Sequence, residues 1–477
     1  MTDTTLAQHL ARFAVDSTFD SLPADVVDSV GLRVLDTLGI AVAATALETS
    51  KAAISWATEQ GGNAVASAVG VRENLPPTLA AFVNGVLAHS LDFDDTHLPS
   101  VLHPSASVVP AALAAAQHHG ATGRDLVRGI AIGLEVCVRL GMAGFDPETK
   151  NSVFFEHGQH ATSICGAMGG AVAAAVIGGA SADGIVDALG IAASMAAGII
   201  EANRTGGTVK RLHCGWAAHS AVSAAGLARH GITGPPTVLE GRFGFFQAWL
   251  HQSGRGEEIT DGLGDHWAAP GIFFKPYPAN HFTHAAIDAA AALRNRGITP
   301  DDVRQYVLGV PAANLRTIGE PIEVKRTPQT GYMAQFSGPY AVAVGMLGGG
   351  GLGAALDDYT DEKATSTQRR EIMARVDVVP DERCDAIFPH QFPAVLTAHL
   401  HDGATVVEEV LTTRGGPDRP LSFDDVRAKF TANVTGLLQD SAATDFAALC
   451  ATLPGITDVG TLLDPLRRLG PAARPSS

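Results

Sequence analysis

Cysteine, aromatic residues and charge are all scarce in this 477-residue chain. It has five cysteines, 6% aromatic residues and 17% charged residues, against 46% hydrophobic residues. Five cysteines are too few, and odd in number, for a disulfide scaffold, and no two of them form a Cys-x-x-Cys pair. Low charge with ample apolar content excludes a largely disordered chain. We therefore expect a globular protein with a large core, divided into roughly two or three domains.

Basic residues are outnumbered by acidic ones. The chain has 33 Lys and Arg against 49 Asp and Glu, and a formal net charge of −16. A nucleic-acid partner requires a basic surface that neutralises phosphates, so this balance argues against one. The field of the whole protein also weakly opposes a small anionic ligand. Any anion site must therefore be locally positive.

Long apolar runs are missing as well. The most apolar stretch, residues 164–180, is 17 residues of mainly Ala and Gly, whereas a bilayer span needs about 20 apolar residues. The first twenty residues lack a basic region followed by an apolar one, which is the pattern of a secretory signal. The five cysteines are expected to be reduced core residues. These observations predict a cytoplasmic protein that does not contact a membrane.

Helical periodicity dominates the chain up to residue 270. Thr122 opens a capping box, with Asp in place of Glu, and Ser181 is a second N-cap. Ser107 is expected to cap a further helix, with Pro110 tolerated in its first turn. These segments are rich in alanine and carry few charges, so several helices must be buried on most sides.

The pattern changes near residue 271. Alternating apolar residues predict strands, the last of them a hairpin that turns at Asp402-Gly403, and a helix is expected over 332–347. The sequence therefore predicts a mainly α fold with a smaller α+β lid. Its expected parts are a discontinuous all-α domain (1–270 and 413–465), an α+β domain (271–412) and a disordered tail (466–477).

Three carboxylates and three histidines fall within the fifteen residues 89–103. Buried Asp and His side chains are costly unless they are paired. The segment is therefore either a catalytic loop that supplies acid and base groups, or a solvated helix end capped by aspartates. A zinc or iron site is a third possibility, but no His-x-x-x-His or two-histidine-plus-carboxylate spacing stands out.

Two further segments carry cations. Arg204 and Lys210 flank a Thr-Gly-Gly-Thr turn that enters a helix, a ready site for a carboxylate, unless this is an ordinary basic surface loop. Lys275, Asn280 and His281 follow one another where the two sequence patterns meet, in a segment stiffened by prolines. Pockets form often at such junctions. The alternative is a rigid linker with an N-cap at Asn280 or Thr283.

Taken together, these segments resemble the MmgE/PrpD family, whose members include 2-methylcitrate dehydratases, cis-aconitate decarboxylases and iminodisuccinate epimerases. The resemblance spans roughly residues 5 to 465. It implies a helical domain with an α+β lid, a homodimer, and catalysis with neither metal nor organic cofactor. The matching segments are LDTLGIAVA (35–43), NGVLAHSLDFDDTH (84–97), HPSASVVPAALA (103–114), KRLHCGWAAHSA (210–221), LEGRFGFF (239–246), FKPYPANHFTHAAIDA (274–289), QFSGPYAVA (335–343) and RGGPDRPLSFDDVRAKF (414–430).

The resemblance also assigns site residues. The family's active-site positions correspond here to Asp92, Thr96, His103, His160, Lys210, Lys275 and Tyr340. One departure stands at Asn280-His281-Phe282, where decarboxylase-type members have a histidine directly after the alanine and methylcitrate dehydratases have Glu-Phe-His.

A chemical role follows for each group. The family's reactions move a proton at a carbon next to a carboxylate, which requires a group such as histidine that titrates near neutral pH. We expect His103 to lead this transfer, with His160 or His281 as the second acid/base group. Tyr340 is assigned a catalytic role by the resemblance alone.

The remaining residues are expected to bind and position the substrate. Lys210, Lys275 and Arg204 would bind carboxylates, because cations offset the charge that moves onto them. Asn280 would bind the substrate beside them. Asp92 and Thr96 would position a histidine or a substrate hydroxyl.

The function expected first is that of a cofactor-independent hydro-lyase acting on a small hydroxy di- or tricarboxylate. Carboxy-lyase or epimerase activity on the same scaffold is the alternative. A non-catalytic dimeric binding protein and a metal-dependent hydrolase are the readings from other classes.

Overall fold

The computed structural model describes residues 4–202 and 207–470. The chain forms two compact units, one made of 1–272 with 433–476 and the other of 273–432. The sequence placed these boundaries at 270 and 412. The second boundary lies later because Arg414 pairs with Asp425 and donates to the Leu352 carbonyl, which attaches this stretch to the second unit.

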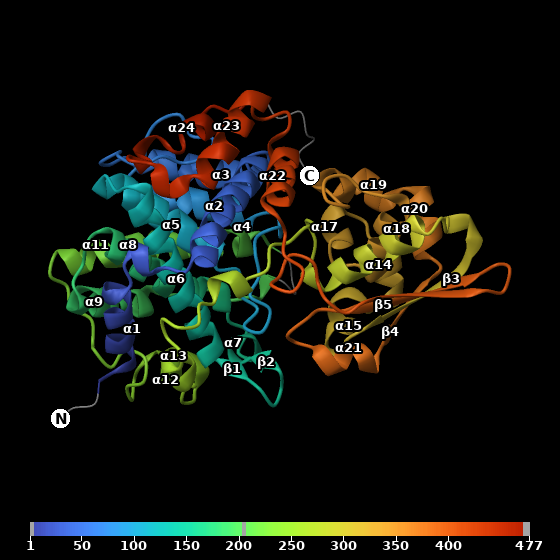
Figure 1. Cartoon of the computed structure of the whole chain (residues 1–477), viewed down its shortest axis with the longest axis horizontal. Coiled ribbons are helices and arrows are strands. Elements are labelled where there is room, and N and C mark those ends of the chain that lie inside the picture. The colour runs from blue at the N-terminus through green and yellow to red at the C-terminus, as the bar shows by residue number, and fades with distance from the viewer. Residues whose placement is uncertain (1–3, 203–206, 471–477) are drawn as a thin grey trace. The chain divides into compact units, whose positions relative to one another are not determined.

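The first unit is helical, as predicted (Figure 1). Besides helices, its described residues form one short hairpin, β1 (Phe145–Asp146) with β2 (Asn151–Ser152). Its helices are α1 (Leu6–Asp16), α2 (Ala24–Ala44), α3 (Glu48–Glu59), α4 (Pro77–His89), α5 (Ser105–His119), α6 (Gly123–Ala143), α7 (Val153–Glu156), α8 (Ala161–Ile177), α9 (Ala182–Met195), α11 (His213–Arg229), α12 (Phe245–Leu250), α13 (Glu257–Thr260), α23 (Asp440–Ala451) and α24 (Asp464–Arg467).

Helix α8 lies at the centre of this unit, and every residue in it is buried. It packs on α5, α6, α9 and α11. Small residues make this possible: a Cβ on Gly169 would lie 2.5 Å from the Gly133 carbonyl oxygen of α6. The two backbones thus touch, and an Ala- and Gly-rich sequence is the consequence.

The C-terminal segment packs on the first helices of the same unit. The Gly70 amide donates to the Leu466 carbonyl at 2.9 Å, and a Cβ on Gly31 in α2 would lie 2.7 Å from the Cys450 carbonyl oxygen in α23. Figure 1 shows α23 and α24, in red, beside α2 and α3, in blue. The predicted return of the chain to the helical domain is what the structure shows.

The second unit contains a four-stranded sheet with the strand order β4-β3-β5-β6. Strands β3 and β4 are parallel and the other pairs are antiparallel. The predicted hairpin is confirmed, with Gly403 at φ +92° in its turn. The strands are β3 (Val303–Val310), β4 (Val376–Pro380), β5 (Ala394–Leu400) and β6 (Thr405–Val410).

Helices α14 and α18 pack against each other, α14 on β5 and β6 and α18 on β4. The second unit's helices are α14 (His284–Asn295), α15 (Leu315–Ile318), α16 (Ile322–Arg326), α17 (Gly331–Ala334), α18 (Gly338–Leu347), α19 (Asp361–Thr365), α20 (Thr367–Met373), α21 (Glu382–Ile387) and α22 (Phe423–Val434).

Two helix predictions need correction. Helix α5 begins at Ser105, so Ser107 is not its N-cap and Pro110 lies inside it. The helix expected over 332–347 is two helices, α17 and α18. Pro339 lies in the first turn of α18, where the missing amide does no harm, and the Ser337 hydroxyl accepts from the Tyr340 amide to start a new helix.

Other predictions hold. Thr122 forms its capping box and Ser181 caps α9, and the five cysteines are free and buried. Among the described residues no single helix is long and apolar enough to cross a membrane, although the bent pair α2 and α3 passes that test by length and composition. Of the predicted tail, 471–477 lie outside the described residues, whereas the Gly470 amide donates to the Leu437 carbonyl.

Candidate active site

Four histidines form a cluster in the first unit, and we call His89, His103, His160 and His213 the histidine cluster. The His89 ring centroid lies 5.6 Å from that of His103 and 5.4 Å from that of His160, and the His160 and His213 centroids are 4.8 Å apart. His89 is the last residue of α4, while the others lie just before or at the starts of α5, α8 and α11. The cluster thus joins helix ends that are far apart in the sequence.

Glycines bring these helix ends together. A Cβ on Gly85 of α4 would lie 2.8 Å from the Gly215 Cα of α11, so the two helices touch one turn from His89 and two residues from His213. Likewise, a Cβ on Gly166 of α8 would meet the Ser107 side chain of α5. Any larger residue at these contacts would separate the histidines.

A buried ion pair fixes the loop that carries His103. The Arg33 guanidinium pairs with Asp95 at 2.7 Å and also donates to two backbone carbonyls, those of Ala269 and Ile272. Asp95 accepts from the Ser105 amide and hydroxyl, and so caps α5. Asp95 is 2% exposed, so it is a buried cap and not part of the solvated helix end that was the alternative for this segment.

His103 has a defined orientation. Its Nδ1 lies 2.7 Å from the Asp95 carbonyl oxygen and 3.3 Å from the Thr96 hydroxyl. A carbonyl can only accept, so Nδ1 carries a proton. Nε2 is then the ring nitrogen at which His103 can gain or lose one. The predicted contact between Thr96 and a histidine is present.

His160 and His213 are hydrogen-bonded to each other through their Nδ1 atoms, which are 2.9 Å apart. One Nδ1 donates and the other accepts. Burial, with His89 and Lys210 nearby, lowers the pKa of His213 to about 4 and that of His160 well below its ordinary value. The pair is therefore neutral at neutral pH.

Lys210 and Asp92 supply the charges. Lys210 lies in the short 3-10 helix Val209–Leu212 that precedes α11, and its Nζ is 4.0 Å from an Asp92 oxygen. Their side chains are 23% and 11% exposed, so ligand and solvent can reach them. Asp92 has φ +51°, in the left-handed region, a strained geometry that is common at functional sites.

The structure brings five of the predicted residues together: Asp92, Thr96, His103, His160 and Lys210. The other predicted residues that it describes belong to the second unit and are treated there. Arg204 lies outside the described residues.

In the second unit, Lys275 and His281 are both buried, 1% and 4% exposed. The Asn280 side-chain oxygen accepts from the Phe282 amide at 3.1 Å, so it is an N-cap, the alternative that the sequence left open. The Tyr340 hydroxyl donates to the Asp358 carbonyl within the core of this unit, and burial raises the pKa of Tyr340.

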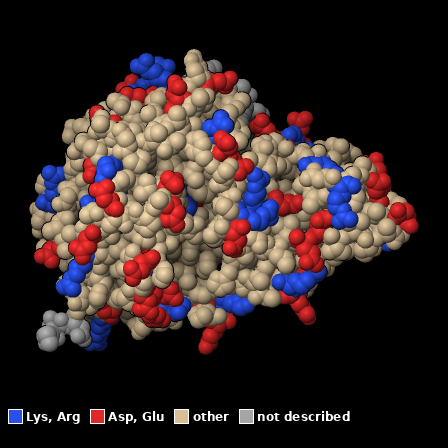
Figure 2. Space-filling model, in the orientation of Figure 1, with Lys and Arg blue, Asp and Glu red and all other residues tan. Residues whose placement is uncertain are grey.

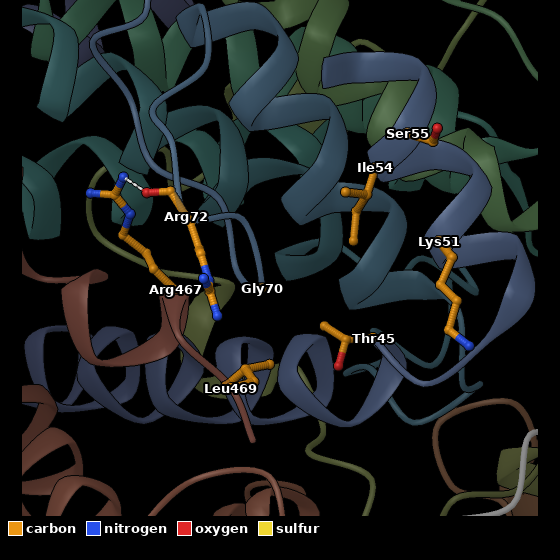
Figure 3. Close-up of a pocket in the computed structure, with 8 residues that line it drawn as sticks. All are labelled: Thr45, Lys51, Ile54, Ser55, Gly70, Arg72, Arg467 and Leu469. Atoms are coloured by element: carbon orange, nitrogen blue, oxygen red, sulfur yellow. Dashed lines mark hydrogen bonds between the residues drawn. The ribbon is translucent and has the colours of Figure 1, made fainter. Parts of the chain in front are cut away.

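A pocket of about 350 Å³ lies elsewhere on the first unit (Figure 3). Its cations are Lys51, Arg72 and Arg467, and Arg467 donates to the Arg72 carbonyl. Lys51 and Arg467 are also paired with carboxylates, at 2.6 and 3.2 Å. The described residues that line this pocket include no histidine or acidic residue, so they do not supply the acid/base groups that the predicted chemistry needs.

Comparison with known proteins also divides the chain into an N-terminal and a C-terminal part. Residues 8–257 match the MmgE/PrpD N-terminal domain and residues 277–453 match the MmgE/PrpD C-terminal domain. The chain belongs to the MmgE/PrpD family. The resemblance predicted from the sequence is thereby confirmed.

Several curated relatives of this MmgE/PrpD-family enzyme carry the same name. Cis-aconitate decarboxylase of Mus musculus is 30% identical over 90% of this chain and 86% of the relative. The Homo sapiens enzyme of that name is 30% identical over 92% and 89%. That of Aspergillus terreus is 25% identical over 95% and 94%.

Three residues of the cluster and its loop were not predicted as site residues from the sequence: His89, Asp94 and His213. His213 stands three residues after Lys210, on the next turn of the chain, which is a local signal. His89 and Asp94 lie inside the segment of three carboxylates and three histidines. Their place beside His160 depends on the contact between α4 and α11, which no local pattern predicts.

Proposed function

We propose that this chain is a carboxy-lyase that decarboxylates cis-aconitate or a closely similar unsaturated tricarboxylate. The support is its similarity, over nearly the whole chain, to enzymes named cis-aconitate decarboxylase. The sequence alone put a hydro-lyase first and this activity second. The relatives favour the second.

Decarboxylation of such an acid consumes one proton. The bond between carbon and the departing carboxyl group breaks, carbon dioxide leaves, and the bonding electron pair moves through the neighbouring double bond. A carbon atom then takes up a proton. The step requires a proton donor beside that carbon and a cation beside the remaining carboxylates.

The observation that carries the proposed proton transfer is the orientation of His103 within the histidine cluster. With Nδ1 donating to the Asp95 carbonyl, the proton that reaches the substrate carbon would leave from Nε2. Lys210 would bind a carboxylate, and its charge is locally positive in an otherwise acidic protein. Asp92, at 4.0 Å, would keep the ammonium in place.

The neutral pair of His160 and His213 would complete this part of the site. Neutral imidazoles can hydrogen-bond a carboxylate without adding charge, which leaves Lys210 as the fixed cation. We propose further that Lys275 and Asn280 bind a carboxylate and that His281 and Tyr340 have catalytic roles, as the family resemblance and the sequence pattern suggest. A homodimer and a cytoplasmic location stay predictions.

On the face drawn in Figure 2, acidic and basic side chains are interspersed, with broad uncharged areas between them. The net charge of −16 is thus not gathered into one repulsive patch on that face. Local charge at Lys210, rather than the global field, would then decide whether a tricarboxylate binds.

Proton NMR in deuterated water tests the proposal. Cis-aconitate and a set of saturated hydroxy tricarboxylates are incubated with the purified protein. A carboxy-lyase converts cis-aconitate to a dicarboxylate that carries one deuterium on carbon, and releases carbon dioxide. A hydroxy tricarboxylate formed without carbon dioxide would show a hydro-lyase instead. Deuterium uptake without net conversion would show an epimerase. Either of these results would overturn the proposal.

A further inference from the structure

His89 is a buried ring of the histidine cluster, and it is held by a carboxylate. The residue is 4% exposed, and its Nδ1 lies 2.6 Å from Asp94 Oδ2. Asp94 is also buried, at 2% exposed. Because a carboxylate accepts, Nδ1 of His89 carries a proton that it donates to Asp94.

The other ring nitrogen of His89 is the unusual one. Nε2 is buried and has no hydrogen-bond partner among the described residues. Most buried polar atoms in proteins are satisfied, so each exception asks for an explanation. The His103 and His160 rings, 5.6 and 5.4 Å away between centroids, flank this imidazole. One bridging water or a substrate group would suffice to join ring nitrogens across such gaps.

A purely structural role explains the bond from His89 Nδ1 to Asp94, but it does not explain the unsatisfied Nε2. The bond from Asp94 to His89 ties the loop after α4 to the helix end. An amide or hydroxyl side chain would tie it equally well, and would not leave a buried ring nitrogen without a hydrogen bond among the described residues. The position of Nε2 therefore points to proton transfer.

We propose that His89, held by Asp94, is a positioning residue that stores a proton and passes it to His103 in each turnover. The proposal rests on the proposed function, in which His103 gives one proton to carbon for each carbon dioxide released. The bond from Nε2 to its proton then breaks on the His89 imidazolium, and a new N–H bond forms on His103 Nε2, directly or through one water. His89 is left neutral, still donating from Nδ1 to Asp94, and regains a proton from solvent.

The surroundings favour His89 as the store. His160 and His213 have lowered pKa values and stay neutral. His89 instead donates from Nδ1 to the buried Asp94 carboxylate. The titratable groups that face it are Asp94 from the loop after α4, His103 from the loop before α5, His160 at the start of α8 and His213 at the start of α11. Lys210 adds a positive charge beside His160 and His213.

Matched variants separate proton storage from packing. In His89→Asn the amide nitrogen can replace Nδ1 and keep the bond to Asp94, but nothing replaces Nε2. We expect kcat to fall by about 10- to 100-fold with KM little changed, and the folded state to survive. Asp94→Asn removes the charge that stabilises the imidazolium, so the alkaline limb of kcat should move to lower pH. His97→Asn, in the same loop, is the control, because its Nδ1 contacts Ser100 instead.

A substrate-free measurement distinguishes this proposal from the proposed function. With 15N-histidine labelling, the resonance lost in His89→Asn identifies His89. Its Nδ1 should stay protonated while Nε2 titrates, and Asp94→Asn should move that titration to lower pH. Should wild-type protein fail to decarboxylate cis-aconitate, only the proposed function falls, and this titration still decides the state of His89. An Nε2 that takes up no proton across about pH 5–8, or a His89→Asn enzyme with wild-type kcat and pH profile, overturns the proposal. If His89→Asn does not fold, His89 is identified by the resonance that Asp94→Asn moves, and the pH profile of Asp94→Asn decides.

Discussion

The Nδ1 atoms of His160 and His213 lie 2.9 Å apart, so two imidazoles from the starts of two different helices are hydrogen-bonded to each other. Two imidazolium ions could not make this bond, because both would donate. The bond is thus possible only while at least one ring is neutral, which agrees with the lowered pKa of each. The protonation state of this pair should therefore affect both the proposed chemistry and the stability of the fold.

The first prediction concerns pH and stability. The folded pKa of His213 is lowered from 6.5 to about 4, so between these values the unfolded chain binds a proton that the folded chain does not. The stability that the neutral His213 contributes should therefore be fully present above pH 6.5, and it should be lost as pH falls from 6.5 towards 4. Urea unfolding at several pH values measures this. His213→Asn should flatten that part of the curve, and an equally steep curve in the variant would contradict the assignment.

The second prediction concerns His103. Replacing it with Gln removes the transferable proton and should lower kcat by about 100- to 10,000-fold. The melting temperature should change little, because the backbone amide of residue 103 keeps its bond to the Thr162 hydroxyl. His118→Gln, at the end of α5 and far along that helix, is a matched control. Near-normal turnover by His103→Gln would remove His103 from the proposed mechanism.

The third prediction concerns Lys210. Lys210→Met keeps the length of the side chain and removes its charge, and should lower kcat/KM by about 100- to 1000-fold, as loss of a charge-stabilising donor does. Lys210→Arg should retain more of the activity because the charge remains. Steady-state kinetics on cis-aconitate measures both. Equal kcat/KM for the Met variant and the wild type would exclude a carboxylate-binding role.

The fourth prediction tests how the cluster is built. A Cβ on Gly215 would lie 2.5 Å from the Phe82 carbonyl oxygen, so Gly215→Ala should force α4 and α11 apart. We expect a loss of about 1–3 kcal/mol in the free energy of unfolding, together with reduced activity. Gly226, on the same helix, has nothing within 4 Å of its Cβ position. Gly226→Ala should be neutral or stabilise by up to about 1 kcal/mol. Similar effects of the two substitutions would show that the contact does not matter.

Local patterns predicted the class of fold and several of its helix starts and turns. Thr122 and Ser181 cap helices because their hydroxyls accept from nearby amides, an interaction within four residues. The Asp402-Gly403 turn is equally local. Ser107 was misassigned because the cap of α5 comes from Asp95, ten residues before Ser105, and that aspartate is held in turn by Arg33. A partner 62 residues away in sequence leaves no trace in a short window.

The site was predictable to the same extent. The dense segment 89–103 and the family resemblance predict His103, Thr96, Asp92 and Lys210 as site residues, and the structure places them in the first unit. The hydrogen bond between His160 and His213 spans 53 residues and depends on how α8 packs beside α11. Whether a histidine is neutral follows from burial, which only the fold reveals. Sequence patterns thus name the residue types, while helix packing decides which of them meet.

The measurement that tests the central claim most directly is carbon dioxide release from cis-aconitate by wild-type protein and by His103→Gln. The account predicts one carbon dioxide for each cis-aconitate consumed by the wild type, with one solvent hydrogen found on carbon in the product. It predicts a rate reduced about 100-fold or more for the variant. Consumption of cis-aconitate without carbon dioxide, or equal rates for the two proteins, would contradict it.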